Sequence, residues 1–210
     1  MKTDILQYIV QHSVEILGTI LCLVYLYLSI KERIGLWIFG FLSSALYIIV
    51  FFESKFYADM SLQVYYLAVS VYGWLMWKRK TGNSDSSDKL QASFLSTRQM
   101  IQYLASVIAV YFIYYLILKY ATDSTIPIMD SLVGALSVVA TWMLTRKKIE
   151  NWLLWILADA VATALFAYKQ LYPTAILYLI YTVMAFVGYY EWKKNYNLQL
   201  SEDNSNPNNL

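Results

Sequence analysis

The apolar residues of this chain gather in long runs that charged or polar residues interrupt. Each run holds about 17–20 mostly apolar residues, close to the number that an α-helix needs to cross a bilayer. Charged or turn residues flank the runs, as Lys31-Glu32-Arg33 does after the first. The pattern therefore predicts seven membrane-spanning helices, at residues 14–30, 35–52, 61–77, 100–118, 126–144, 152–168 and 173–192.

The first three predicted helices and the last three are related by an internal repeat of 115 residues. A shift of the chain by this length superposes identical residues without a gap. The pairs include Trp37 with Trp152, Tyr66 with Tyr181, Gly73 with Gly188 and Trp77 with Trp192. The alternative is chance similarity between two apolar stretches, but chance matches leucines far more easily than tryptophans and a glycine in one register.

The repeat also predicts the architecture. Three helices reverse the direction of the chain across the membrane, and the helix between the repeats reverses it again, so both triplets cross in the same direction. We therefore predict an all-α membrane protein with seven helices in a 3+1+3 parallel-repeat arrangement. Transporters built from repeats bind their substrates near the middle of the membrane, where the repeats meet.

This architecture divides the chain into six predicted parts. They are an N-terminal interfacial segment (1–13), a first three-helix repeat (14–80), a cytoplasmic loop (81–98), a linker transmembrane helix (99–120), a second three-helix repeat (126–194) and a disordered cytoplasmic tail (195–210). The loop and the tail are polar, and the tail is rich in asparagine. We expect both to be flexible and neither to carry chemistry.

Lysine and arginine residues are distributed unequally between the two sides of such a chain. Four of the sixteen belong to the side with the N-terminus, and twelve belong to the side with the C-terminus. Cytoplasmic loops carry the excess of basic residues in membrane proteins. We therefore expect the N-terminus outside and the C-terminus in the cytoplasm.

Composition excludes several other classes of protein. Hydrophobic residues make up 59% of the chain and charged residues 14%, whereas a disordered chain has low hydrophobicity and high charge. The single cysteine, Cys22, excludes a disulfide-stapled domain. A net charge of +2, with no basic patch in a folded water-facing segment, argues against binding of nucleic acid.

Asp159 is the leading candidate for substrate binding, because ionisable residues inside a membrane are costly and often functional. Helical spacing places Trp152 and Trp155 on the same stripe as Asp159. A carboxylate beside tryptophan rings suits an organic cation, since aromatic faces attract cations by about 0.5–2 kcal/mol each. The equivalent stripe of the first repeat contains Trp37 and Ser44. The alternative role of Asp159 is a hydrogen bond between helices.

The third and seventh predicted helices add polar and aromatic candidates. The amide of Gln63 can both donate and accept hydrogen bonds, as ligand hydroxyl groups require. Its repeat partner is Tyr178, and Tyr66 and Tyr181 form the next pair on the same helices. A hydrogen bond between helices is the alternative for Gln63. We expect Gln63 and Tyr178 to bind hydroxyl groups of the substrate, and Trp152 and Trp155 to stack on its heterocycle. Tyr66 and Tyr181 are further candidates for the site.

The other aromatic residues near the cytoplasmic boundary have a simpler interpretation. Trp77 and Trp192 fit the belt of aromatic side chains at a membrane interface. Gly73 and Gly188 favour close contact between helices over contact with substrate.

Motifs of enzymes and cofactor sites are missing from the sequence. It has one histidine, His12, and no Cys/His cluster, glycine-rich phosphate loop or nucleophile elbow. We therefore predict neither enzymatic activity nor a bound metal or cofactor. A seven-helix receptor or scaffold remains the alternative to a transporter.

Several stretches together resemble a known family. The second half contains Glu-Asn-Trp-Leu-Leu-Trp at 150–155, Tyr-Lys-Gln-Leu-Tyr at 168–172 and Gly-Tyr-Tyr-Glu-Trp at 188–192. The first half contains the related Gly-Trp-Leu-Met-Trp at 73–77. Over residues 14–194 the chain resembles the PnuC family of vitamin-precursor transporters, and the Glu-Asn-Trp-x-x-Trp stretch is the most specific part.

This resemblance implies a fold similar to that of the sugar-transporting SWEET proteins and a homotrimer in the inner membrane. It also implies uptake of nicotinamide riboside by facilitated diffusion, with the substrate then trapped by a cytoplasmic kinase. Related members take thiamine, riboflavin or deoxynucleosides. We predict alternating access around a site in the middle of the membrane.

One residue departs from the family pattern. The members that transport nicotinamide riboside favour asparagine in the stretch after the paired tryptophans, and this chain has Asp159 there. Nicotinamide riboside and thiamine are both flat cations with hydroxyl groups, so a carboxylate is compatible with either. The sequence thus predicts a cationic vitamin precursor, with nicotinamide riboside first and thiamine as the alternative.

Overall fold

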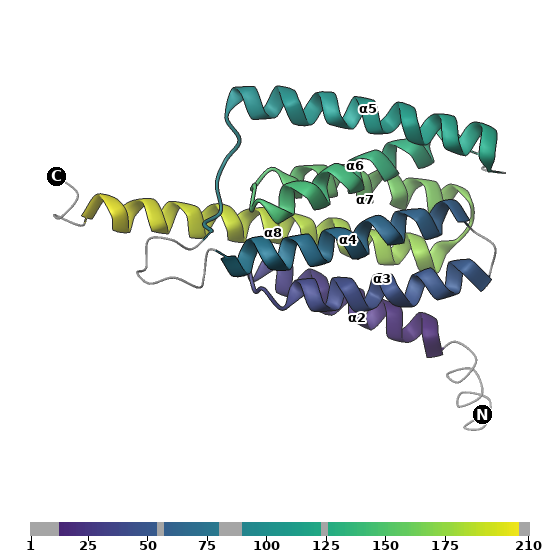
Figure 1. Ribbon diagram of the computed structural model, residues 1–210, viewed down its shortest axis with the longest axis horizontal. Helices are drawn as coiled ribbons and strands as arrows, with labels where there is room; N and C mark the ends of the chain where they lie inside the picture. Colours follow the sequence, from purple (N-terminus) through teal and green to yellow (C-terminus); the bar gives the residue numbers. More distant parts are fainter. Residues whose placement is uncertain (1–12, 54–56, 80–89, 123–125, 206–210) are drawn as a thin grey trace. The chain divides into compact units, whose positions relative to one another are not determined.

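The computed structural model describes residues 13–53, 57–79, 90–122 and 126–205, and almost all of them are helical (Figure 1). The prediction of an all-α chain is confirmed over these residues. Their seven helices are α2 (Ser13–Ile30), α3 (Leu36–Glu53), α4 (Tyr57–Arg79), α5 (Thr97–Ala121), α6 (Pro127–Thr145), α7 (Asn151–Tyr168) and α8 (Tyr172–Ser205). The expected interfacial segment at 1–13 lies almost wholly outside the described residues.

Four of the described helices are long and apolar enough to cross a membrane. They are α5, α6, α7 and the Tyr172–Ser201 part of α8. Shorter apolar stretches lie in α2 and α3, at Leu17–Ile30 and Leu36–Phe52. The helices therefore occupy the positions that the apolar runs predicted, and the parallel 3+1+3 arrangement stays a prediction.

The chain divides into two compact units, Met1–Lys78 and Arg79–Leu210. In the first unit, α2 packs along α3 through small residues that face tyrosine rings. A Cβ atom at Gly18 would lie 2.8 Å from the Tyr47 hydroxyl, and one at Gly40 would lie 3.0 Å from the Tyr25 ring. Glycine at these positions allows the two helices to approach closely.

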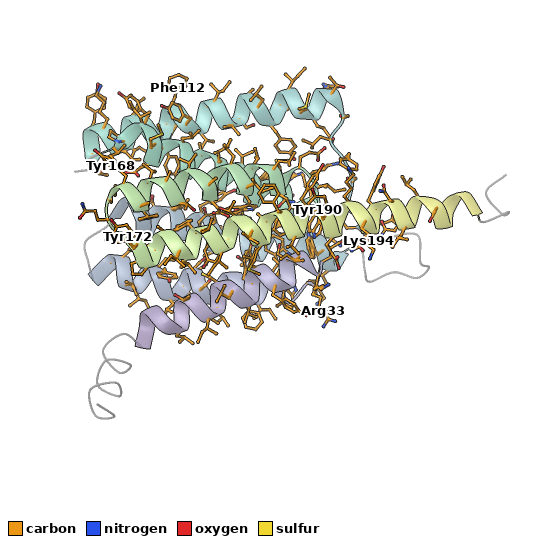
Figure 2. All side chains as sticks on the ribbon, turned by 180° about the vertical axis from the view of Figure 1, so that it is seen from behind. Arg33, Phe112, Tyr168, Tyr172, Tyr190 and Lys194 are labelled. Atoms are coloured by element: carbon orange, nitrogen blue, oxygen red, sulfur yellow. The ribbon has the colours of Figure 1, made fainter. Side chains whose placement is uncertain are left out.

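In the second unit each helix packs along the next, from α5 to α8. The most buried is α6, where Gly134 faces the ring of Tyr114 from α5. No residue of α5 is buried, and the side chain of Phe112 points away from the rest of the unit (Figure 2). An apolar helix with this exposure suits contact with lipid, as expected of a linker helix in a membrane.

The turns after α2 and α6 have the same geometry at the predicted spacing of 115 residues. Glu32 and Lys147 both adopt positive φ angles, 51° and 49°. The next residue donates its N–H to a carbonyl five positions earlier in each case, with N···O distances of 2.9 Å and 3.1 Å. This pattern is the Schellman motif, which usually places glycine at the left-handed position. The two copies therefore share a turn that neither builds with glycine.

The end of α8 corrects one expectation. We predicted a disordered tail from residue 195, but the helix continues to Ser205. Its 34 residues correspond to about 50 Å of helix, well beyond a hydrocarbon core of about 30 Å. An existing helix extends at little cost, and Tyr196 packs edge-on against Phe94 at 5.1 Å between ring centroids.

The loop predicted at residues 81–98 is also more ordered than expected in its described part. Residues 90–96 are not helical, but Ser93 pairs with Lys148 in an isolated parallel β-bridge. The predicted flexibility is therefore wrong for this segment, because its backbone groups have partners in the turn between α6 and α7.

Candidate functional site

Asp159 lies near the middle of α7, eight residues after its first residue. Its side chain is 6% exposed. The buried residues that flank it along the helix are Ala158 and Ala162, and Thr163 donates a hydrogen bond to the Asp159 carbonyl at 2.7 Å. Eight residues span about 12 Å of helix, so Asp159 belongs to the central part of this membrane span.

Two ring contacts define how α7 and α8 pack. Phe166 and Tyr178 stack near the turn between the helices, with centroids 5.1 Å apart and planes at 22°. Trp152 and Trp192 meet at the other end, with centroids 5.7 Å apart and planes at 84°. Both contacts fit one antiparallel register, and that register places Ala185 opposite Asp159. Ala185 is buried, so the neighbour of the carboxylate on α8 is a small side chain.

The ring of Trp152 is held tightly between α7 and α8. A Cβ atom at Gly188 would lie 2.6 Å from this ring, and Trp192 packs edge-on against it. The side chain of Trp152 is 1% exposed, so neither face is open to a heterocycle in this structure. Its indole Nε1 is buried and has no hydrogen-bond partner among the described residues.

Trp155 lies one turn further along the same face of α7 and is half-buried. It is therefore the less buried of the two tryptophans on this stripe. On α8, Tyr178 and Tyr181 meet edge-on at 5.7 Å between centroids. Five of the predicted site residues thus lie on the adjoining helices α7 and α8: Trp152, Trp155, Asp159, Tyr178 and Tyr181.

The first unit repeats the tryptophan contact. Trp37 meets Trp77 edge-on at 5.5 Å and 87°, and a Cβ atom at Gly73 would lie 2.4 Å from the Trp37 ring. The Nε1 atom of Trp37 is buried and, like its counterpart, lacks a described hydrogen-bond partner. The two units therefore share the same Trp–Gly–Trp packing at the predicted spacing.

Trp77 and Trp192 were expected in an interface belt, and the structure shows that this is wrong. Both side chains are buried, because each packs against the tryptophan of the preceding helix. The paired glycines were correctly expected to permit close helix contact. The signal that sequence reasoning missed is the joint spacing of tryptophan, glycine and tryptophan in each repeat.

The remaining candidates of the first unit lie on α3 and α4. Ser44 is buried, as is Ser70, whose hydroxyl donates to the Tyr66 carbonyl at 2.8 Å. Gln63 and Tyr66 are half-buried and lie one turn apart on α4. The predicted site residues of the first unit are Trp37, Ser44, Gln63 and Tyr66.

The two repeats differ where the second tryptophan stands. The counterpart of Trp155 in the first repeat is Gly40, and the ring of Tyr25 covers it. The counterpart of Tyr25 is Ala140, which is fully buried. The bulky side chain is therefore on the first helix of one repeat and on the second helix of the other.

The described residues contain no group of three or more His, Cys, Asp or Glu side chains that could hold a metal ion. In the second unit, Lys169 and Asp130 form a charged pair at 3.6 Å. It joins the ends of α7 and α6 that lie away from Trp152.

Comparison with known proteins identifies the family. The model of the nicotinamide mononucleotide transporter family matches residues 12–194. The nicotinamide riboside transporter PnuC of Escherichia coli strain K12 is 29% identical over 203 residues, covering 85% of this chain and 84% of that protein. The PnuC of Neisseria mucosa is 27% identical, covering 87% and 71%. The riboflavin/roseoflavin transporter RibM of Streptomyces davaonensis is 25% identical, covering 87% and 86%.

A crystal structure of the vitamin B3 transporter PnuC shares the fold. It superposes with a TM-score of 0.72 at 22% identity, covering 91% of this chain and 85% of the other. The resemblance to the PnuC family is therefore confirmed, and the apolar helices fit a multi-pass protein of the inner membrane. This chain belongs to the nicotinamide mononucleotide transporter family and is a membrane transporter rather than an enzyme.

Proposed function

We propose that this protein transports nicotinamide riboside across the inner membrane. The observation that carries the proposal is the buried carboxylate of Asp159, in the middle of α7 and one helical turn from the half-buried Trp155. A carboxylate in a low-dielectric interior needs a positive partner, and the nicotinamide ring of the riboside carries one. Relatives named as nicotinamide riboside transporters support the same substrate.

Some of the candidate residues contact the substrate in this proposal. Asp159 faces the positive ring and Trp155 stacks on it. Trp152 is buried against Gly188 and Trp192 in this structure, and no contact with the substrate is proposed for it. Gln63 and Tyr178 bind the ribose hydroxyls. The remaining predicted site residues are Trp37, Ser44, Tyr66 and Tyr181, and no separate contact with the substrate is proposed for them.

Thiamine is the alternative substrate, because its thiazolium ring would also pair with the Asp159 carboxylate. Riboflavin carries no positive charge, although RibM is named for its transport. A competition assay with purified protein separates these substrates, since the preferred one displaces labelled nicotinamide riboside at the lowest concentration. The homotrimer and the trapping kinase stay predictions from the family resemblance.

We propose facilitated diffusion by alternating access, with no ion coupling. Purified protein in liposomes should take up labelled nicotinamide riboside to the external concentration, at a rate that ionophores for protons and sodium leave within about twofold. A facilitator moves the cationic substrate only down its own electrochemical gradient. With the membrane potential held at zero by potassium and valinomycin, collapse of the proton and sodium gradients therefore removes no driving force. Loss of uptake with ionophores would contradict this mechanism, and binding without any uptake would favour a receptor.

The orientation is proposed with the N-terminus outside and the C-terminus in the cytoplasm. Twelve of the sixteen basic residues belong to the side with the C-terminus in a seven-helix chain. A green fluorescent protein fused after Leu210 should fluoresce in a bacterial host, whereas alkaline phosphatase fused there should be inactive. Active phosphatase at this position would reverse the assignment.

A further inference from the structure

A cytoplasmic clamp joins the segment before α5 to the turn before α7. We define it as residues 92–95 on one side and residues 147–150 on the other. Ser93 donates its N–H to the Lys147 carbonyl at 3.0 Å and accepts at its own carbonyl from the Ile149 N–H at 3.1 Å. The Lys148 ammonium group donates to the Ser93 hydroxyl at 2.9 Å. These residues are 55 positions apart in the sequence, so the contacts are tertiary.

Glu150 joins the clamp to the start of α7, the helix that carries Asp159. Its Oε1 accepts a hydrogen bond from the Leu95 N–H at 2.8 Å. The residue is the N-cap of α7, and its counterpart in the first repeat is Gly35. The shared fold of the two repeats therefore does not require a carboxylate here. Its function must come from something that the second repeat alone possesses, and the clamp is such a feature.

The other side of the clamp leads directly into α5. Ser96 caps this helix, since its hydroxyl accepts from the Gln99 N–H at 3.4 Å and the Gln99 side chain accepts from the Ser96 N–H at 3.1 Å. Phe94, between the two clamp contacts, points to Tyr196 of α8. An extended segment directs alternate side chains to opposite sides. The segment thus contacts the α6–α7 turn with residues 93 and 95, and α8 with residue 94.

We propose that Glu150 is a positioning residue for transport: through the clamp it fixes the start of α7 on the linker segment, and so sets the position of Trp152, Trp155 and Asp159. Glu150 does not touch substrate in this proposal. The linker helix is then part of the body that carries the substrate residues. The transport readout of this inference rests on the proposed function.

The test compares Glu150→Ala with Glu150→Gln in liposomes. The alanine variant leaves the Leu95 N–H without its acceptor, and we expect the KM for nicotinamide riboside to rise about tenfold, since small misplacements of binding groups have large effects. In Glu150→Gln, the amide oxygen can still accept the hydrogen bond from the Leu95 N–H. The amide nitrogen takes the place of Oε2, which has no hydrogen-bond partner among the described residues. We therefore expect its KM to stay within about threefold of the wild-type value. A purely structural defect would lower the amount of active protein, and hence the maximal rate, at an unchanged KM.

A disulfide distinguishes positioning from direct contact. In a Cys22→Ser background, Ser93→Cys and Lys148→Cys place two thiols on bridged residues, which lie within the range of Cα separation that disulfides need. Copper phenanthroline and oxygen accept the two electrons and two protons that the thiols lose. The disulfide should return the KM of Glu150→Ala to within about threefold of wild type. The proposal would be overturned if the KM stayed raised after the disulfide had formed. It would also be overturned if Glu150→Ala had the same KM as the wild type.

Hydrogen exchange gives a readout that does not depend on transport. In the wild type, the backbone of residues 92–96 should exchange at least about tenfold more slowly than an open chain, and Glu150→Ala should remove this protection. Unprotected exchange in the wild type would show that the clamp does not form, whether or not the riboside is the substrate. If Glu150→Ala does not fold, the disulfide between Ser93→Cys and Lys148→Cys is tested in a protein that keeps Glu150. Locking the clamp in this way should leave uptake intact, and a loss of uptake would overturn the proposal.

Discussion

Replacing Asp159 with asparagine should weaken the binding of nicotinamide riboside by about 30-fold or more, because loss of one partner of a buried charge pair costs about 2–5 kcal/mol. The change preserves the volume of the side chain and removes its charge. The Asp159 side chain is 6% exposed, and Ala158 and Ala162 beside it on α7 are also buried, so water screens the carboxylate little. Calorimetry with purified protein measures the affinity.

A neutral ligand makes this prediction specific. Dihydronicotinamide riboside has the same ribose and nearly the same ring without the positive charge. Its affinity should change by less than about threefold in Asp159→Asn, because no charge pair is lost. Asp130→Asn is the matched control, since this carboxylate is about one-third exposed and pairs with Lys169 away from the tryptophans. Equal affinity of wild type and Asp159→Asn for the cationic riboside would remove the proposed role of Asp159.

Placing valine at Gly188 should lower the free energy of unfolding by about 3 kcal/mol, the upper part of the range for an overpacked core. A Cβ atom there would lie 2.6 Å from the Trp152 ring, which also packs edge-on against Trp192. Gly73→Val should have a similar effect in the first unit, where the corresponding distance to Trp37 is 2.4 Å. Thermal unfolding in detergent measures both changes.

Two variants test whether this loss comes from the tryptophan. Gly35→Val should change stability by less than about 1 kcal/mol, since the nearest atom to its Cβ position is a Leu28 methyl group at 3.6 Å. Trp152→Phe in the Gly188→Val protein should recover part of the loss, because the smaller ring leaves room for the valine. If Gly188→Val is as stable as wild type, the tight packing described around Trp152 is wrong.

The apolar runs predicted the helices well because a bilayer imposes both length and composition on a spanning helix. The repeat could also be read from the sequence, and the equal geometry at Glu32 and Lys147 supports it. Asp159 stood out for a similar reason: an ionisable residue is conspicuous in an apolar run.

Other features depend on contacts that no local pattern contains. A tryptophan at a helix end looks the same in sequence whether it faces an interface or a neighbouring helix, so the burial of Trp192 could not be foreseen. The clamp needs Ser93 and Lys148 to meet across 55 residues. Composition likewise indicated disorder after residue 195, because it does not register the contact between Tyr196 and Phe94.

The two repeats carry a large aromatic side chain on different helices, Tyr25 on α2 and Trp155 on α7. This difference has a consequence for the number of substrate molecules that the chain can bind. A duplicated chain could have kept an equivalent aromatic side chain at this position in each half. Here the first half covers Gly40 with its own tyrosine, while the second half keeps Trp155 beside a carboxylate. Duplication has thus preserved the scaffold but not the equivalence of the two halves at this position. If the proposed site is correct, we expect each polypeptide to bind one substrate molecule in a single orientation.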